Sequence, residues 1–266
     1  MTFALVFPQI DPVAVAIGPL AIRWYALAYV VGILLGWGWA ARLGRSQPTV
    51  AKLAIDDFAM WATLGIVLGG RLGYVLFYKP LYFLHNPLEI FVVWQGGMAF
   101  HGGFLGVMTA VLLFSRKRGV PLFVLGDLIA CAAPIGLFFG RIANFVNGEL
   151  WGRVSDAPWA MVFPNAGPEP RHPSQIYQAG LEGLLLFALM TLVVWGGGRR
   201  RPGLLIGVFL MGYGAARVVG EFFRQPDAHL GFLFAGATMG QLLSLPMLLA
   251  GMWFVRRALI RPPVSA

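Results

Sequence analysis

Seven long apolar stretches constrain what this chain can fold into more than any other feature of its sequence. A helix needs about 20 mostly apolar residues, at about 1.5 Å each, to cross a hydrocarbon core of about 30 Å. The stretches that reach or approach this length are residues 21–43, 57–78, 100–115, 122–146, 175–196, 203–223 and 236–256. The third is short, which suggests that residues 88–100 dip into the membrane before it, packed against protein. The sequence therefore predicts an all-α integral membrane protein with seven transmembrane helices, in which residues 1–266 form a single transmembrane domain.

The composition agrees with a chain that meets lipid over most of its surface. Of the 266 residues, 58% are hydrophobic and only 12% are charged, against about 25% charged in a typical soluble domain. Nine Trp, seven Tyr and 21 Phe suit aromatic belts at the two membrane interfaces. The single Cys131 and four scattered histidines cannot build a structural zinc site. We therefore expect no soluble domain and no bound metal.

The positions of the basic residues predict the orientation of the chain. Three Lys or Arg residues follow each of the first, third, fifth and seventh stretches, and with seven spans all of these lie on one side. The positive-inside rule makes that side cytoplasmic, so we expect the N-terminus outside and the C-terminus in the cytoplasm. Residues 147–174, rich in Pro, Gly and Asn, then form a small cap on the outer side. Because basic residues at helix ends are drawn to anionic lipid, the net charge of +9 requires no nucleic acid partner.

The sixth stretch contains charged residues that lipid would not tolerate. Four of its residues are spaced by four, four and three positions, which places them on one face of a helix. They are Tyr213, Arg217, Glu221 and Arg224. Since an Arg at the bilayer centre costs about 2.5–3.5 kcal/mol even on a lenient scale, this stripe is expected to face the bundle interior or a hydrated cavity. An Arg–Glu pair that only joins two helices is the alternative.

The fourth stretch ends in a second group of residues that we assign to one helical face. They are Arg141, Asn144, Gly148 and Glu149. Guanidinium groups bind phosphate through two parallel hydrogen bonds and stay charged at any relevant pH. Arg141 and Arg217 lie at similar depth on two predicted spans, so we interpret them as a phosphate clamp. Snorkelling of each side chain to the interface is the alternative, and it fits Arg71 and Arg224 better.

One histidine, His101, lies in an apolar segment, between two Gly-Gly pairs in GGMAFHGG. The glycines let the backbone approach other groups closely and would leave the imidazole at the mouth of the third span. An imidazole with a pKa of about 6.5 suits proton transfer, although a lone histidine more often has a structural role. Tyr25 and Tyr29, near the outer end of the first span, fit an aromatic belt. No G-x-S-x-G or Walker motif occurs, which argues against a serine protease or an NTPase.

Six segments of the sequence carry a specific pattern, in this order. They are RWYALAY (23–29), GGRLGYVLFY (69–78), GGMAFHGG (96–103), GRIANFVNGELWGR (140–153), RHPSQIYQ (171–178) and GYGAARVVGEFFRQPD (212–227). Together they resemble the prolipoprotein diacylglyceryl transferase family. The resemblance implies an enzyme that transfers the sn-1,2-diacylglyceryl group of phosphatidylglycerol to the lipobox cysteine thiol of a preprolipoprotein, with a thioether and glycerol 1-phosphate as products and no metal or organic cofactor. It also implies a multi-pass protein of the bacterial inner membrane, with seven spans and a periplasmic cap.

The family pattern carries over to this chain residue by residue. The matching positions are His101, Arg141 and Arg217, as catalytic residues, and Tyr25, Asn144, Glu149, Gly152, Tyr213 and Glu221, as substrate-binding residues. In that chemistry His101 takes the thiol proton, and the two arginines stabilise the departing phosphate ester. The expected partners are phosphatidylglycerol, the lipobox segment and membrane lipids. A phospholipid or anion transporter with an arginine-lined cleft is the alternative, but it would need a path to both faces, and these residues cluster in the outer half.

Overall fold

The computed structural model describes residues 5–8, 10–18, 20–45, 52–93, 96–226 and 231–264. Most of them are helical, and they contain six helices that are long and apolar enough to cross a membrane. By their internal contacts they form two compact units, named here the first unit (residues 1–39 and 127–265) and the second unit (residues 40–126). The helices agree with the predicted all-α integral membrane class, and six of the seven predicted spans are found by length and composition.

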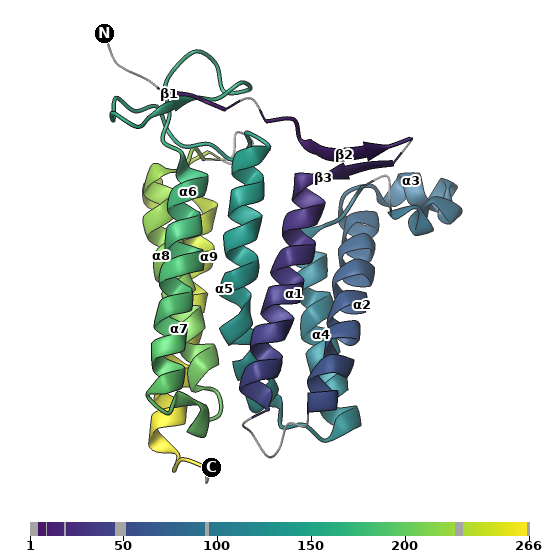
Figure 1. Ribbon diagram of the computed structural model, residues 1–266, viewed down its shortest axis with the longest axis vertical. Helices are drawn as coiled ribbons and strands as arrows, with labels where there is room; N and C mark the ends of the chain where they lie inside the picture. Colours follow the sequence, from purple (N-terminus) through teal and green to yellow (C-terminus); the bar gives the residue numbers. More distant parts are fainter. Residues whose placement is uncertain are drawn as a thin grey trace. The chain divides into compact units, whose positions relative to one another are not determined.

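The first unit contains long helices beside short β-ladders (Figure 1). Its uninterrupted long helices are α1 (Trp24–Gly44), α5 (Leu122–Val146), α8 (Leu204–Phe223) and α9 (Met239–Ile260). A further helical run consists of α6 (Ser174–Gln178), the π-helical segment η3 (Ala179–Leu185) and α7 (Leu186–Trp195). Two short turns are η4 (Gly198–Arg200) and η5 (Phe234–Gly236). Residues 40–44 of α1 and 122–126 of α5 belong to the second unit.

Glycines set how closely the helices of the first unit pack. The antiparallel helices α8 and α9 meet at Gly207 and Gly251, where a Cβ on either residue would lie 2.9 Å from the carbonyl oxygen of the other. A Cβ on Gly32 of α1 would lie 3.2 Å from the Cα of Gly136 in α5. Such close approach of backbones is the usual way in which membrane helices pair.

The N-terminal residues form two ladders that hydropathy does not reveal. They are β1 (Leu5–Val6) with β4 (Met161–Val162), in parallel, and β2 (Val13–Ile17) with β3 (Leu20–Arg23), antiparallel. The predicted start of the first span at residue 21 is therefore wrong, because α1 begins at Trp24. Val and Ile favour strands, and Gly18, with φ +58°, allows the tight turn between them. An apolar strand that runs straight into an apolar helix gives one continuous hydropathy signal.

The second unit is built on two antiparallel helices. Its elements are α2 (Lys52–Phe77), α3 (Pro80–His85), the turn η1 (Pro87–Phe91) and α4 (Phe100–Arg118). A Cβ on Gly65 of α2 would lie 2.6 Å from the carbonyl oxygen of Gly106 in α4, and one on Gly69 would collide with Gly102. Helix α4 extends beyond its predicted end at residue 115, and its last turn contains three basic residues. With this charged last turn, α4 is not one of the six described helices that are apolar enough to span.

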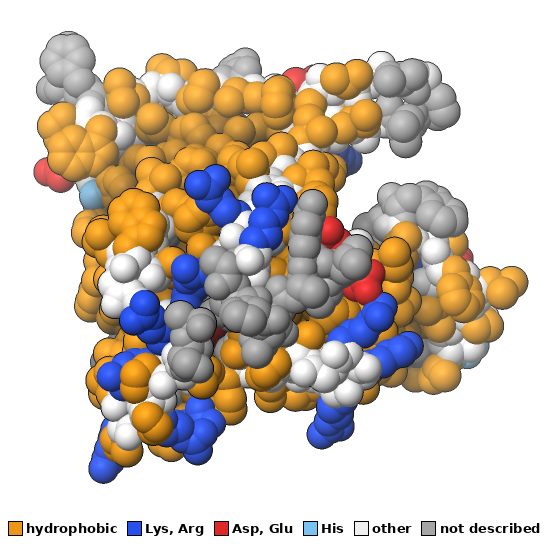
Figure 2. Space-filling model, turned by 60° about the horizontal axis from the view of Figure 1, so that its bottom comes forward, with side chains coloured by type: hydrophobic (Ala, Val, Ile, Leu, Met, Phe, Trp, Pro, Cys, Tyr) orange, Lys and Arg blue, Asp and Glu red, His pale blue; other side chains and the backbone are white. Residues whose placement is uncertain are grey.

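The two ends of the first unit differ in chemistry. At one end the cap, residues 147–173, connects α5 to α6, and Leu5 N donates to Ala160 O at 2.9 Å. At the other end Val264 N donates to Arg200 O at 2.8 Å. The N-terminal strand β1 and the cap therefore share one end, and the C-terminal residues share the other with the basic turn η4. In the view of Figure 2, Lys and Arg side chains (blue) stand among a largely hydrophobic surface (orange).

Candidate functional site

The charged residues of α8 meet charged residues of two other helical segments inside the first unit. Arg141, near the C-terminal end of α5, donates from Nε to Glu182 Oε2 at 2.9 Å, and its Nη2 lies 2.8 Å from the same oxygen. Glu182 belongs to η3 and is fully buried. Arg217 of α8 approaches the other carboxylate oxygen, with Nη1 3.6 Å from Oε1. One buried carboxylate thus lies between the two arginines of the predicted clamp.

A second carboxylate, Glu221, extends this cluster along α8. Arg217 Nη2 lies 2.8 Å from Glu221 Oε1, and Arg224 Nη1 lies 3.2 Å from the same oxygen. The other oxygen accepts a hydrogen bond from Thr238 Oγ1 at 2.6 Å, just before α9 begins. Gly240 leaves room for this carboxylate, since a Cβ there would lie 2.7 Å from Glu221 Cδ. Glu221 is therefore held from both α8 and the start of α9.

Five residues form one connected set, called here the arginine–glutamate network: Arg141, Glu182, Arg217, Glu221 and Arg224. Its arginine side chains are 10–14% exposed and its glutamates at most 3%. This burial confirms that the α8 stripe faces the interior. Snorkelling, the alternative considered for Arg224, is wrong because its guanidinium pairs with Glu221 in the interior. The ion pairs also join α5, η3 and α8, so helix pairing is part of what the network does.

Tyr213 adds a hydroxyl to the network. It lies one turn before Arg217 on α8, and its hydroxyl is beside the guanidinium of Arg141. Its ring stacks on that of Phe209, with 5.8 Å between centroids. The phenol therefore borders the clamp from the same helix face as Arg217.

Asn144 and Glu149 form a second polar cluster where α5 ends. Asn144 Nδ2 donates to Glu149 Oε1 at 2.8 Å, and Gln175 Nε2 donates to the Glu149 carbonyl oxygen at 2.7 Å. Tyr25, at the start of α1, lies beside Asn144, and its hydroxyl is 3.3 Å from that of Tyr29. Tyr25 therefore lies beside this polar cluster and also forms a pair with Tyr29, as expected of an aromatic belt.

The structure corrects one prediction about the end of α5. The helix stops at Val146, and Gly148, with φ +63°, turns the chain out of the helical direction. Gly148 and Glu149 are therefore not on the helical face predicted for them. Glu149 consequently pairs with Asn144 and not with Arg141. The Asn-Gly pair at this point is a typical turn signal.

Gly152 lies where two segments come too close for a side chain. Its N–H donates to the His172 carbonyl oxygen at 2.9 Å, and it forms an antiparallel bridge with Arg224. A Cβ on Gly152 would lie 2.5 Å from that oxygen and 2.6 Å from the carbonyl oxygen of Phe223. Gly152 therefore acts through its small size, by letting the cap close against the C-terminal end of α8.

His172 belongs to the packing of the cap. Burial lowers the pKa of its imidazole below the ordinary value, and Asp156 opposes this shift, so the ring is neutral near pH 7. Its Nδ1 lies 3.1 Å from the hydroxyl of Tyr177, to which Trp159 Nε1 donates at 2.6 Å. This contact joins the cap to α6.

Several buried polar atoms around the network have no hydrogen-bond partner among the described protein groups. They are Gln175 Oε1, both polar atoms of Gln178, Glu182 Oε1 and Arg217 Nη1. Gln178 is fully buried and packs against Gly220 of α8, where a Cβ would lie 3.2 Å from Gln178 Cγ. Buried polar atoms nearly always find a partner, which is water or a ligand where the protein supplies none. The network therefore has hydrogen-bonding capacity left for another molecule.

His101 lies in the second unit, as the exposed second residue of α4. The segment before it is held by Arg71 of α2. Arg71 donates from Nε to Ile90 O at 2.8 Å, from Nη1 to Gly96 O at 2.7 Å and from Nη2 to Glu89 O at 2.5 Å. Arg71 is only 7% exposed, so the alternative that it snorkels to the interface is wrong. It organises the loop that leads to His101.

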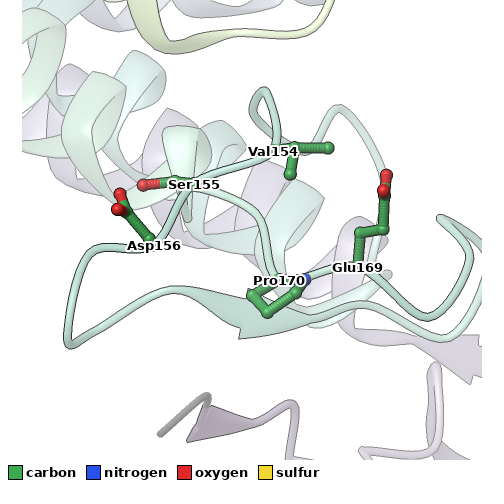
Figure 3. A pocket seen from close by; sticks show the side chains of 5 residues that line it. All are labelled: Val154, Ser155, Asp156, Glu169 and Pro170. Carbon is green, nitrogen blue, oxygen red and sulfur yellow. The ribbon is translucent and has the colours of Figure 1, made fainter. Parts of the chain in front are cut away.

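The cap also contains an open hollow of about 420 Å³. Figure 3 shows the side chains that line it: Val154, Ser155, Asp156, Glu169 and Pro170. No residue of the network or of the Asn144 cluster lines it, and its two carboxylates would repel a phosphate. The hollow is therefore a feature of the cap surface and not a phosphate site.

Fold and site together define a class: a multi-span helical membrane protein that keeps an arginine–glutamate network, with an unused donor on Arg217, inside its helices. Such intramembrane charges mark a functional site for an ionic group. The profile of the family described as "Prolipoprotein diacylglyceryl transferase" matches residues 12–257. The chain belongs to this family.

Its relatives are similar over nearly their whole length. A protein of Paramagnetospirillum magneticum named phosphatidylglycerol–prolipoprotein diacylglyceryl transferase is 64% identical, and the match covers 97% of this chain and 98% of the relative. A protein of the same name from Rhodopseudomonas palustris is 60% identical over 94% of this chain and 90% of its own. One from Methylocella silvestris is 54% identical over 100% of both.

Glu182 is a candidate functional residue that the sequence analysis missed. It is the one acidic residue of the predicted span 175–196, and the energetic rule that made the α8 stripe informative applies to it equally. Gln178, one turn before it, was also missed, because an amide in an apolar span gives a weaker signal than a charge. The pairing of Glu182 with both arginines depends on helix packing and has no local sequence signature.

Proposed function

We propose that this chain transfers the diacylglyceryl group of phosphatidylglycerol to the thiol of a lipobox cysteine in a preprolipoprotein, which forms a thioether and releases glycerol 1-phosphate. Relatives that match it along their whole length carry the name of this activity. The structural observation that carries the proposal is the network, in which two guanidiniums surround one buried carboxylate and Arg217 Nη1 has no hydrogen-bond partner among the described protein groups. Guanidinium is well suited to phosphate recognition in both charge and shape.

The proposed reaction exchanges a carbon–oxygen bond for a carbon–sulfur bond. The thiol gives its proton to a base, the thiolate attacks the glyceryl carbon, and the bond from that carbon to the phosphate oxygen breaks with its electron pair on oxygen. The phosphate gains one negative charge, which Arg141 and Arg217 stabilise in a site of low dielectric constant. Because a free thiol with a pKa of about 8.5 is mostly protonated at neutral pH, a base accelerates the attack. His101 is the proposed base.

The other site residues are proposed to bind or orient the lipid headgroup: Tyr25, Asn144, Glu149, Gly152, Tyr213 and Glu221. Tyr213 and Glu221 contact arginines of the network directly, so they orient the guanidiniums. Asn144 and Glu149 follow Arg141 along the chain and offer an amide and a carboxylate to the glycerol hydroxyls. Gly152 acts by closing the cap onto α8.

A transfer assay with purified protein tests this proposal. Mixed micelles of phosphatidylglycerol and a lipobox peptide should yield diacylglyceryl peptide and glycerol 1-phosphate in equal amounts, measured by mass spectrometry. A peptide with serine in place of the lipobox cysteine should stay unmodified, because its hydroxyl is far less acidic than a thiol. The alternative, a transporter with the same arginines, would move lipid between leaflets and form no covalent product. That result would reject the transferase.

We also propose seven spans, with α4 as the additional one. Strands β1 and β4 are hydrogen-bonded to each other, so they lie on one side of the membrane. Three helices that can span lie between them in the chain, namely α1, α2 and α5. An odd number of crossings would put the two strands on opposite sides, so α4 supplies a fourth. With the positive-inside rule, this order favours an outer N-terminus and a cytoplasmic C-terminus in a bacterial inner membrane.

Cysteine labelling in intact cells checks this orientation. The only native cysteine, Cys131, is fully buried and should not react. Asn165→Cys in the cap should react with a membrane-impermeant maleimide, whereas Pro263→Cys, beyond α9, should react only after the cells are opened. Both positions are exposed in the structure. The opposite pattern would overturn the orientation, and outside labelling of both would contradict the three spans between them.

A further inference from the structure

We infer that Glu182 is a positioning residue that sets both the geometry and the charge of the arginine clamp, so that the site suits a phosphate with a single negative charge. The inference rests on the proposed function for the identity of that phosphate. It adds a residue and a role to that function: the carboxylate holds the two guanidiniums in place and limits how tightly an anion binds.

The position of Glu182 depends on the π-helical segment η3. A π-helical turn closes its hydrogen bonds over one more residue than an α-helical turn and is frequent at functional sites. The neighbouring Gly183 packs against Phe138 of α5, where a Cβ on the glycine would lie 2.6 Å from Phe138 Cβ. This close packing brings η3 up to α5, and the carboxylate reaches Arg141 on α5 as well as Arg217 on α8.

The two contacts of Glu182 are unequal. Arg141 holds Oε2 through Nε at 2.9 Å and Nη2 at 2.8 Å. Arg217 Nη1 is 3.6 Å from Oε1, which is an ion pair but too long for a hydrogen bond. Neither of these two atoms has a hydrogen-bond partner among the described protein groups. The Arg217 side of the clamp therefore keeps a donor for a phosphate oxygen.

The charges of the network leave one positive charge in the absence of a substrate, because three arginines face two glutamates. A phosphodiester brings one negative charge and would balance the charge of these five side chains. When its ester bond breaks, the phosphate gains further charge, and the attraction grows along the reaction path, as catalysis requires.

Loss of the Glu182 charge would change both the geometry and the net charge of the arginine clamp. The Arg141 and Arg217 guanidiniums would face each other without the anion that separates them, and like charges repel strongly where the dielectric constant is low. The site would bind any phosphate more tightly, the product included, while the guanidiniums lost their orientation. Tighter binding and slower turnover should therefore occur together.

Glu182→Gln tests this, because it keeps the shape of the side chain and removes its charge. Calorimetry on the purified variant in detergent should show glycerol 1-phosphate bound at least about tenfold more tightly, since one positive charge is uncovered. In the transfer assay kcat should fall at least about thirtyfold, because Arg141 loses its charged acceptor. The KM for phosphatidylglycerol should fall as well.

Two further variants separate charge from geometry. Glu182→Asp keeps the charge but withdraws the carboxylate by one methylene, so kcat should fall while the affinity for glycerol 1-phosphate stays within about twofold. Glu169→Gln makes the same charge change at an exposed position of the cap and should alter neither quantity. Thermal unfolding of each variant shows whether it is folded.

Unchanged or weaker binding of glycerol 1-phosphate by folded Glu182→Gln would overturn the role in charge, and normal kcat in Glu182→Asp would overturn the role in geometry. If Glu182→Gln does not fold, Glu182→Asp decides, because a merely structural residue would lower affinity and kcat together. Binding is measured without turnover. If the wild-type protein binds glycerol 1-phosphate but transfers nothing, the proposed function is rejected. The binding measurements on Glu182→Gln then still test the effect of the Glu182 charge.

Discussion

Turnover should fall at least about a hundredfold when alanine replaces either Arg141 or Arg217, as it does when an enzyme loses one donor to a developing oxyanion. Each of these side chains is only 14% exposed, so solvent cations cannot take its place. Lysine at either position keeps the charge but loses the planar fork, and should also abolish most of the activity. Initial rates of transfer from phosphatidylglycerol to a lipobox peptide measure these effects.

The double variant Arg141→Ala/Arg217→Ala should lose less than the two single losses predict together, because both side chains act on one phosphate. Arg118→Ala is the matched control. Arg118 pairs with Asp57 at the surface, with 51% of its side chain exposed, and exposed ion pairs contribute little. Near-normal activity in both single alanine variants would remove the clamp from the mechanism.

Replacing His101 with glutamine should change the shape of the pH profile and not only its height. Glutamine keeps hydrogen bonding and approximate size but cannot take a proton. The substrate thiol must then ionise unaided, and its thiolate fraction rises about tenfold per pH unit below a pKa near 8.5. The activity of the variant should therefore climb steeply up to about that pH. Wild-type activity, with a base in place to take the thiol proton, should level off at a lower pH than the activity of the variant.

The measurement is kcat against pH at saturating lipid. His85→Gln serves as the control, because His85 is an exposed histidine of α3 in the same unit, and its profile should follow the wild type. If wild type and His101→Gln differ only by a constant factor, His101 orients the lipid and does not take the proton. The base would then have to be Glu149 or a bound water.

Charged residues in apolar stretches predicted the site better than hydropathy predicted the limits of the elements. Arg217 and Glu221 had to face the protein interior because lipid would not tolerate them, and the structure buries both. Glu182 obeys the same rule, since it lies in an apolar span and is fully buried. This rule identifies which charged residues face the protein interior, but it does not identify which of them form ion pairs with one another.

The limits of the elements were harder to predict because adjacent segments share their composition. The hairpin before Trp24 is as apolar as the helix that follows it. At the end of α5, Gly148 ends the helical direction two residues after Val146, and a spacing rule that assumes a continuing helix placed Glu149 on the wrong face. In both places a local turn, and not hydropathy, decides where the element begins or ends.

The sequence by itself determined that this chain spans a membrane, because apolar stretches of this length have no other place to be buried. It also determined that the α8 stripe turns inward. Only the tertiary structure decided which residues of the site pair with one another. Glu182 meets Arg141 across 41 positions of the chain, because Gly183 lets η3 approach α5 and α8 brings Arg217 to the other side of the same carboxylate. Such a contact depends on how helices pack, which spacing within one helix does not encode.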